Sequence, residues 1–386
     1  MARRFLRVLG ALLLLLPPGA GGVEWTGYAK HFLLVSDRPG SGEPVSGLAT
    51  TRVRLAVRWE PLEAIRAELA YGLIPQVGGG GLSQLFAGGG LAYRIGDLSE
   101  ALYPSEEQRG GLVVRQNLDR LNVALRVGIV DLRLGRQPVA FGSARTVNPT
   151  DVLAPFVVWA LDKEERIGVD AVRARVSLGN FSELDGGAVF GEGISLQKGA
   201  AFLRTQTQAL GADVSALALW FQGHRLIGLD VARSLGGASL WLEAAGYRPE
   251  EGDPFLRASL GGDYYLPSGV YGAAEYHYNG VGTTRREAYG EVRQRPIVNA
   301  AQISLVGKHY LSLSLAYSPA PLWNLSGGLI GNLSDRSALL MPRVEYNPQP
   351  DLYWELGALW GLRLLEAPAE FDERSRAVFT AMRFYF

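Results

Sequence analysis

The chain ends in the sequence Arg376-Ala-Val-Phe-Thr-Ala-Met-Arg-Phe-Tyr-Phe386, in which two kinds of side chain alternate. The first kind is mainly apolar or aromatic and comprises Val378, Thr380, Met382, Phe384 and Phe386. The second kind is mixed and comprises Ala377, Phe379, Ala381, Arg383 and Tyr385. Because successive side chains of a β-strand point to opposite faces, this stretch predicts a strand with one apolar face. Such a strand suits a closed barrel whose outer face meets lipid and whose inner face meets water.

The same alternation returns along most of the chain. Residues 53–59 and 65–71 form one hairpin-like pair, and residues 121–127 and 130–134 form another. Helical spacing fits none of these windows, so each is predicted to be a strand. Further candidates are residues 24–35, 168–178, 183–193, 199–206, 209–220, 225–233, 238–247, 255–265, 270–278, 301–318, 322–331, 338–347, 351–361 and 375–386.

These segments predict an all-β fold, a transmembrane antiparallel up-and-down β-barrel of about 18 strands. The number falls to about 16 if residues 199–206 are a loop. With both termini on the periplasmic side, the short links fall on that side: Glu60 to Leu62, Gly128, Pro267 to Gly269, Ser318 to Pro321 and Asn347 to Pro350. The long insertions then fall outside the cell: residues 73–118, 138–167, 279–300 and 362–374. Short turns on one side and long loops on the other are typical of outer-membrane barrels.

Residues 1–22 have the features of a cleaved signal peptide. An apolar run from Val8 to Leu16 follows three arginines, and Ala20 and Gly22 have the spacing of a signal-peptidase site. An N-terminal membrane anchor is the alternative, but a spanning helix needs about 20 apolar residues. The sequence therefore predicts export and a single mature barrel domain, residues 23–386.

The composition excludes several functional classes. The chain has 38 basic and 38 acidic residues; removal of three arginines with residues 1–22 leaves 35 against 38, a balance of about −3. This balance argues against a nucleic-acid partner. The chain has no cysteine, so disulfides, thiolate metal sites and cysteine nucleophiles are excluded.

The aromatic terminus at Phe386 resembles the C-terminal signal by which bacterial outer-membrane barrel proteins are recognised for assembly. This resemblance implies a bacterial outer-membrane location. It also implies two partners, the outer-membrane lipid and the barrel-assembly machinery, the latter bound through Phe386.

The inward faces of the predicted strands carry unevenly distributed charges. The early strands contribute Arg52, Arg54, Arg58, Arg66, Arg120, Arg126, Arg133, Arg173 and Arg175, against Glu68 and Asp131. The later strands contribute Asp230, Glu243, Asp263, Glu275 and Glu355, and the last strand contributes Arg383. A basic wall opposite a mixed to acidic wall would orient dipolar solutes in a pore and exclude apolar ones. The alternative is that these charges pair across strands and fill space, but about 18 strands enclose too wide a lumen for that.

A loop is therefore expected to narrow the lumen, and the best candidate is residues 138–167. It follows the element Gly135-Arg136-Gln137, it contains the turn signal Asn148-Pro149, and Thr150 or Asp151 can cap a short helix through Leu161. The Gly-Arg-Gln element and the Asn148-Pro-Thr-Asp151 loop resemble those of the alginate-export-like and related Gram-negative porins. By this resemblance Arg136, Arg145 and Asp151 are the residues of the constriction loop. Phe141 stands where that family more often has Trp.

The resemblance implies an outer-membrane porin, a passive diffusion channel for small hydrophilic and often anionic solutes through an Arg-lined lumen. It implies a monomer, although general porins are trimers. It does not identify the solute. No cofactor is predicted.

Other functional classes are less well supported. None of the four histidines can be paired with a serine as in an outer-membrane esterase, so no catalytic residue is assigned. No histidine pair has the spacing of metal ligands, so no metal ligand is assigned either. A non-conducting structural or adhesive outer-membrane barrel remains the alternative to a channel.

Overall fold

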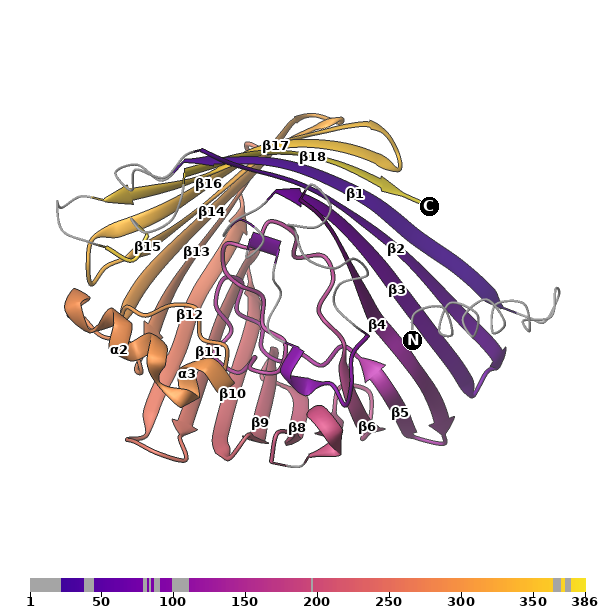
Figure 1. Cartoon of the computed structure of the whole chain (residues 1–386). Helices are drawn as coiled ribbons and strands as arrows, with labels where there is room; N and C mark the ends of the chain where they lie inside the picture. Colours follow the sequence, from indigo (N-terminus) through magenta and orange to yellow (C-terminus); the bar gives the residue numbers. More distant parts are fainter. Residues whose placement is uncertain are drawn as a thin grey trace.

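The computed structural model describes residues 22–37, 45–78, 82, 85–86, 91–98, 111–195, 197–363, 369–371 and 376–386. The predicted signal peptide lies outside the described residues except for Gly22, so the prediction of cleavage stays a prediction. Within the described part, the chain forms one closed wall of antiparallel strands that surrounds irregular segments and short helices (Figure 1).

The wall has 18 strands. They are β1 (Val23–Asp37), β2 (Ser46–Leu62), β3 (Ile65–Gly78), β4 (Leu112–Val127), β5 (Val130–Gln137), β6 (Val169–Ser177), β7 (Glu183–Val189), β8 (Ala200–Ala209), β9 (Ala212–Phe221), β10 (His224–Leu235), β11 (Ala238–Arg248), β12 (Phe255–Tyr265), β13 (Val270–Asn279), β14 (His309–Ala320), β15 (Trp323–Asn332), β16 (Ser337–Gln349), β17 (Leu352–Arg363) and β18 (Arg376–Tyr385). Each strand pairs with the next in the chain, and β18 pairs with β1. The prediction of an up-and-down antiparallel barrel is therefore confirmed, with 18 strands, because residues 200–209 form a strand.

The last strand closes the barrel with the alternation that its sequence predicts. In β18, Val378 and Met382 are about half exposed, whereas Phe379 and Ala381 are buried on the inner face. The terminal residue Phe386 continues the pairing beyond the strand: its carbonyl accepts a hydrogen bond from the Gly27 amide at 2.7 Å, and its amide donates to the Gly27 carbonyl at 3.0 Å. A closed barrel leaves no free strand edge.

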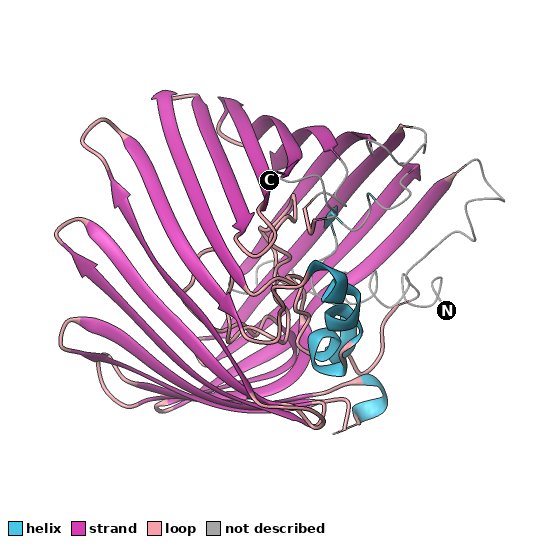
Figure 2. Ribbon diagram, turned by 90° about the vertical axis from the view of Figure 1, so that its left-hand side faces the viewer, coloured by secondary structure: helices cyan, strands magenta, loops and turns pink. Residues whose placement is uncertain are grey.

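The two rims of the barrel differ. The rim that carries the links from even-numbered to odd-numbered strands has connections of two to five residues and is called the short-turn end. The opposite rim, called the long-loop end, carries the connections at residues 79–111, 138–168 and 280–308. The start of β1 and the end of β18 both lie at the short-turn end. Figure 2 shows irregular segments and helices inside the wall of strands.

Two local expectations were wrong. Residues 150–161 form turns, bends and irregular backbone rather than a helix, because Thr150 bonds the barrel wall and Pro155 interrupts the segment. The strand expected from residue 301 begins at His309, and the helices η5 (Arg286–Ala288), α2 (Tyr289–Gln294) and α3 (Pro296–Ala300) precede it. Pro296 stands at the first turn of α3, where its missing N–H costs no hydrogen bond.

The outer face of the barrel is covered by exposed apolar side chains. Leu33, Leu55, Leu229, Leu313 and Leu356 are 39–57% exposed, each on the outward face of a different strand. An apolar surface of this extent is expected to contact lipid or another apolar surface. Among the described residues, no helix is long and apolar enough to cross a membrane.

The closing contact at Gly27 gives a test of the fold. A Cβ atom at position 27 would lie 2.6 Å from the Phe386 ring and 2.7 Å from the Arg54 carbonyl oxygen. We expect Gly27→Ala to lower the free energy of unfolding by about 1–3 kcal/mol, because the chain end must move. A urea titration measures this change, with the folded fraction determined from the heat-modifiable mobility of the barrel on a gel.

The matched control is Gly47→Ala, since a Cβ there would lie 3.9 Å from the Leu34 carbonyl oxygen, an ordinary contact distance. The control should retain the stability of the unsubstituted protein. Equal effects of the two substitutions would show that Phe386 does not contribute to closure.

Candidate functional site in the barrel lumen

The connection between β5 and β6, residues 138–168, crosses the inside of the barrel and is called the lumen loop. Its residues take part in two separate clusters of buried apolar side chains. The first cluster joins Phe141, Val152 and Leu153 to the inner faces of β8 to β11. The second joins Val147, Val158 and Trp159 to the inner faces of β1 and β14 to β18. The lumen loop therefore contacts two opposite walls.

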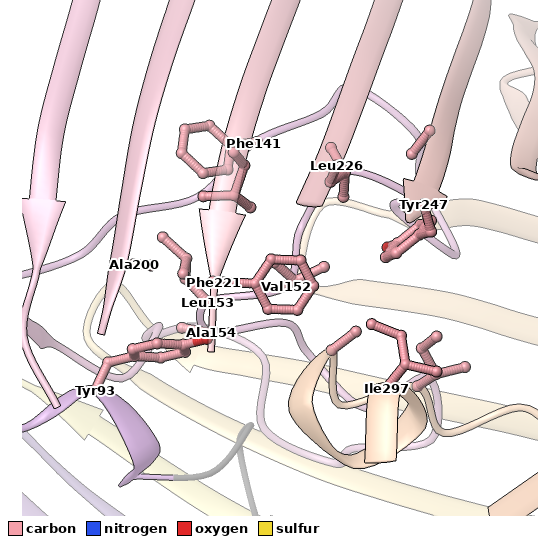
Figure 3. Packing of buried hydrophobic residues seen from close by; sticks show 14 of the residues in the cluster. Tyr93, Phe141, Val152, Leu153, Ala154, Ala200, Phe221, Leu226, Tyr247 and Ile297 are labelled. Carbon is pink, nitrogen blue, oxygen red and sulfur yellow. The ribbon is translucent and has the colours of Figure 1, made fainter. Parts of the chain in front are cut away.

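Figure 3 shows the first cluster. Phe141 and Leu153 lie among Phe221, Leu226 and Tyr247 of the wall, and Tyr93 and Ile297 come from two other connections. Phe141 packs edge to face on Phe202, with 5.1 Å between the ring centroids. Phe141 is thus part of this cluster at the position where Trp is more common in the resembled family. Three long-loop connections meet at this cluster.

Two inward carboxylates hold the lumen loop on one wall. Glu243 of β11 accepts hydrogen bonds from the Ala144 amide at 3.1 Å and from the amide and hydroxyl of Thr150, each at 2.7 Å. It also accepts one from the Asn148 side chain at 3.1 Å. Glu243 is fully buried, and its partners Ala144 and Thr150 are buried as well. Glu243 was predicted to line a pore, and in the structure it is covered by the loop.

Glu275 of β13 makes a similar set of contacts with residues 145–147 of the loop. Its oxygens accept hydrogen bonds from the amides of Arg145 at 2.7 Å and Val147 at 2.9 Å, and more weakly from Thr146 at 3.2 Å. The Trp241 indole also donates to Glu275, at 2.9 Å. Buried backbone N–H groups need acceptors, and in this loop carboxylates of the wall supply them.

The far side of the lumen loop is held by cations of the opposite wall. Asp162 accepts from Lys30 of β1 at 3.1 Å and from Arg52 of β2 at 2.8 Å. Lys30 is fully buried and also pairs with Glu164, which accepts a hydrogen bond from the Tyr385 hydroxyl at 2.7 Å. Burial alone would raise the pKa of Asp162, but the charges of Arg52 and Lys30 outweigh it and hold that pKa below its usual value.

Further arginines of the early strands are neutralised where the loop returns to the wall. Arg54 pairs with Asp119 at 3.4 Å and Glu165 at 3.2 Å. Arg120 pairs with the same two acids, at 2.6 Å and 3.3 Å. Asp119 also accepts from the Gly168 amide at 3.1 Å.

Arg136 was assigned to the constriction loop, but it lies at the end of β5. There it forms a two-pronged pair with Asp170, at 2.7 Å and 2.9 Å, and contacts Asp97 at 3.3 Å. Arg145 and Asp151, the other two predicted loop residues, do lie in the lumen loop. The Arg145 side chain is 58% exposed, contacts Asp263 at 3.4 Å and lies 5.4 Å from the Trp241 ring.

The other predicted site residues form smaller pairs. Asp230 accepts from Ser143 of the lumen loop. Arg173 pairs with Asp185 at 2.6 Å, and Arg383 pairs with Glu345 and, at 3.0 Å, with Glu355. Arg58, Arg66 and Arg126 are 52–68% exposed, and their respective partners are Glu24, Glu60 and Asp131.

A polar hollow of about 150 Å³ opens near the short-turn end, between β2 and β6. Its lining includes five of the predicted arginines: Arg66, Arg126, Arg133, Arg173 and Arg175. No ion pair within the described residues involves Arg133 or Arg175. Three acids, Glu60, Glu63 and Asp131, line the same hollow, so its lining carries an excess of two positive charges.

Several residues of the site carry no periodic signal in the sequence. Lys30 lies on the inward face of a predicted strand, and inward charge could have identified it. Asp162, Glu164 and Glu165 lie in an irregular segment, and their partners are far away in the chain. Among the described residues, no cluster of three or more histidine or acidic side chains is arranged to hold a metal ion.

Besides Asp162, two titrating groups of the lumen loop have shifted pKa values. Burial raises the pKa of Asp151 to about 6, although the adjacent Arg166 acts in the opposite direction. Burial, together with the charge of Arg343, lowers the pKa of Lys163 to about 8. The Lys163 ammonium donates to the Val158 carbonyl at 2.6 Å.

The fold is similar to solved outer-membrane porin structures. A BenF-like porin from Pseudomonas fluorescens Pf-5 matches with a TM-score of 0.58 and 9% identity, over 96% of this chain and 100% of that chain. OccD3 (OpdP) of Pseudomonas aeruginosa matches with a TM-score of 0.56 and 11% identity, over 95% and 92%. OpdK of Pseudomonas aeruginosa, in a structure with vanillate, matches with a TM-score of 0.58 and 8% identity, over 94% and 98%.

At these identities the similarity establishes the fold alone. No family model matches the chain, and no curated protein matches it. The resemblance to the alginate-export-like family therefore stays a prediction.

The Glu275 contacts lead to a first prediction for the site. In Glu275→Gln one oxygen becomes an NH₂ group, which faces the loop N–H donors instead of accepting from them. We expect the protection of the amides at 145–147 against hydrogen exchange to fall by about 10- to 100-fold, the range for hydrogen bonds to a charged group.

Hydrogen exchange followed by mass spectrometry measures the effect in this segment. Glu345→Gln is the control, because Glu345 bonds Arg383 and does not contact the lumen loop in the described contacts. Unchanged protection in Glu275→Gln would show that this carboxylate does not hold the loop.

The pKa of Asp151 leads to a second prediction. Because the packed loop raises this pKa from 3.8 to about 6, packing favours the protonated acid. The stabilisation is complete below about pH 4 and is lost as the pH rises through about 6, and it amounts to roughly 3 kcal/mol.

Exchange protection of the lumen loop, corrected for intrinsic rates, should therefore decrease between pH 4.5 and 7. Asp151→Asn should remove this dependence, because the amide does not titrate. A variant with the same pH profile as the unsubstituted protein would assign the dependence to another group.

Proposed function

We propose that this chain is an outer-membrane porin, a passive diffusion channel for small hydrophilic solutes. One observation carries the proposal: the barrel of 18 strands is apolar on its outer face and lined by charged side chains inside. This distribution of apolar and charged side chains fits a barrel that is surrounded by lipid and contains water. The similarity to porin structures supports the same reading at the level of the fold.

We propose further that the channel prefers anions. In the described structure most inward arginines are paired with acids, so a uniformly Arg-lined path does not support this preference. The support comes from the hollow at the short-turn end, whose lining has five arginines against three acids, and in which Arg133 and Arg175 form no ion pair among the described residues. An excess of cations in a polar hollow raises the local concentration of anions. OpdK, one of the similar structures, is described with vanillate, which is a carboxylate.

Assembly through Phe386, a monomeric state and cleavage of the signal peptide belong to the same proposal. The pairing of Phe386 with Gly27 supports a role of the chain end in closing the barrel. No enzymatic role is proposed. Ser259, which bonds His277 at 2.9 Å, is fully buried against the lumen loop, where a substrate would have no access.

A non-conducting structural or adhesive barrel is the second candidate. The observation that favours it is the pair of buried apolar clusters, because they place side chains of three connections inside the barrel. The two candidates differ in whether a continuous aqueous path remains beside the lumen loop.

Planar-bilayer recording separates the two candidates. The porin proposal predicts stepwise currents. In a KCl gradient, the reversal potential should lie closer to the equilibrium potential of Cl⁻ than to that of K⁺. We expect Arg133→Gln combined with Arg175→Gln to lower the Cl⁻/K⁺ permeability ratio by roughly fivefold, because about 1 kcal/mol of attraction is lost for an ion near a solvated charge.

Arg225→Gln is the control, because Arg225 is an exposed residue on the same outward face of β10 as Ile227 and Leu229. It should leave the reversal potential unchanged. A silent barrel would support the second candidate, and an unchanged ratio in the double variant would overturn the role of the hollow.

A further inference from the structure

The outer face of the barrel has an apolar hollow of about 390 Å³ near the short-turn end. It spans four strands, β11 to β14, and is called the outer groove. Its outward lining consists of Leu240, Gly262, Tyr264, Gly272, Ala274, Leu313 and Leu315.

The groove faces away from the lumen. Leu240, Tyr264 and Leu315 are 41–61% exposed, whereas their chain neighbours Trp241 and Ser314 lie on the inner face, with Trp241 only 3% exposed. Asp263 borders the groove, but its carboxylate is turned inward and accepts from the Tyr271 hydroxyl at 3.1 Å. The groove wall is therefore almost wholly apolar.

Missing side chains create this groove. Gly262 pairs with Leu240 on one side and with Ala274 on the other, and Gly272 pairs with Tyr264 and Leu315. A Cβ at Gly272 would lie 3.5 Å from the Leu315 side chain, so a larger residue there would occupy the hollow. Both glycines have ordinary extended backbone, so neither is required by a left-handed conformation.

A cation borders the groove. Arg233 of β10 is directly opposite Leu240 in the strand register and lies on the same outward face as Ile227 and Leu229. Directly opposed residues on one face have Cβ atoms about 5 Å apart. Arg233 is exposed and takes part in no ion pair found within the described ranges. The β10–β11 turn at Gly236 and Gly237 follows shortly after, so Arg233 is near the rim of the barrel.

We propose that the outer groove and Arg233 form a binding site for one anionic phospholipid. An acyl chain fills the groove, and the phosphate group pairs with the Arg233 guanidinium at the membrane interface. Guanidinium groups bind phosphate through paired hydrogen bonds, and basic residues near a membrane surface attract anionic lipids. The inference rests on the outer-membrane location proposed above, and it is independent of conduction.

A phospholipid fits this surface better than a second copy of the chain. It brings a flexible apolar chain and a phosphate on one molecule, which matches an apolar hollow beside a single cation. A second barrel would have to present a rigid ridge together with an outward acid opposite Arg233. A contact between copies is therefore an outcome of the test and not the proposal.

Native mass spectrometry of the detergent-solubilised full chain tests the site. The probes are phosphatidylglycerol and phosphatidylcholine with identical acyl chains. The unsubstituted protein should retain one phosphatidylglycerol with at least about fivefold higher affinity than phosphatidylcholine. Arg233→Gln should reduce this preference to about one, and Gly272→Phe should weaken the binding of both lipids.

A double-mutant cycle links the cation to the groove. Arg233→Gln and Gly272→Phe should be non-additive, because they remove two contacts of the same lipid. Arg225→Gln, at the other end of β10, should be additive with Gly272→Phe. Ala274→Leu is a second groove-filling variant, and heat-modifiable gel mobility identifies the variants that have folded.

Three results would overturn the proposal: equal affinity for the two lipids, an unchanged preference in Arg233→Gln, or dimers that disappear in folded Gly272→Phe. The last result would assign the groove to a second copy of the chain. Single-channel conductance should be unchanged in Arg233→Gln. A silent barrel that still selects phosphatidylglycerol would contradict the channel proposal alone, whereas a conducting barrel without lipid preference would contradict the lipid site alone.

Discussion

The arrangement of the lumen depends on the hydrogen bonds that the backbone of the lumen loop makes to the barrel wall. A segment that leaves the wall and crosses an interior must find acceptors for its amides, because an unpaired buried N–H costs about 1–3 kcal/mol. Glu243 and Glu275 supply these acceptors from neighbouring odd-numbered strands on one side of the barrel. The Tyr247 and Ser259 hydroxyls add hydrogen bonds to the carbonyls of Pro149 and Val147, at 2.6 Å and 2.7 Å.

The lumen loop also neutralises charges on the opposite wall. Arg52, Arg54 and Lys30 point inward, and the loop brings Asp162 and Glu165 to them. Removing one member of such a pair would leave a buried charge without a partner, which costs more than the pair contributes. The loop thus neutralises the wall that it reaches. An excess of positive charge remains near the short-turn end, where five arginines and three acids line the hollow.

The sequence predicted the barrel well, because strands in a closed wall have a strict two-residue period. The terminal segment shows this: the buried positions of β18 are Ala377, Phe379 and Ala381, as its alternation indicates. The same rule placed Glu243 and Glu275 on the inner face. It could not show that they bind the loop, because backbone amides of the loop have no signature in the sequence.

Irregular segments explain the remaining differences. The acids at Asp162 and Glu165 follow no period, and their partners in β1 and β2 lie more than 100 residues away in the chain. The helix expected after Thr150 is absent because Thr150 bonds Glu243 with both its amide and its hydroxyl. The helices α2 and α3 were missed because their apolar side chains pack on the lumen clusters, and such tertiary contacts override weak local propensity.

Disulfide trapping of the lumen loop tests the central claim, that it is fixed across the barrel. The chain has no cysteine of its own, and the side chains of Ser143 in the loop and Asp230 in β10 are in contact. In a Ser143→Cys, Asp230→Cys variant, the two thiols should form a disulfide under mild oxidation. The measurement is the free-thiol content of the folded, non-reduced barrel. Loss of both thiols agrees with a loop that lies against β10, whereas two free thiols in a folded barrel would contradict it.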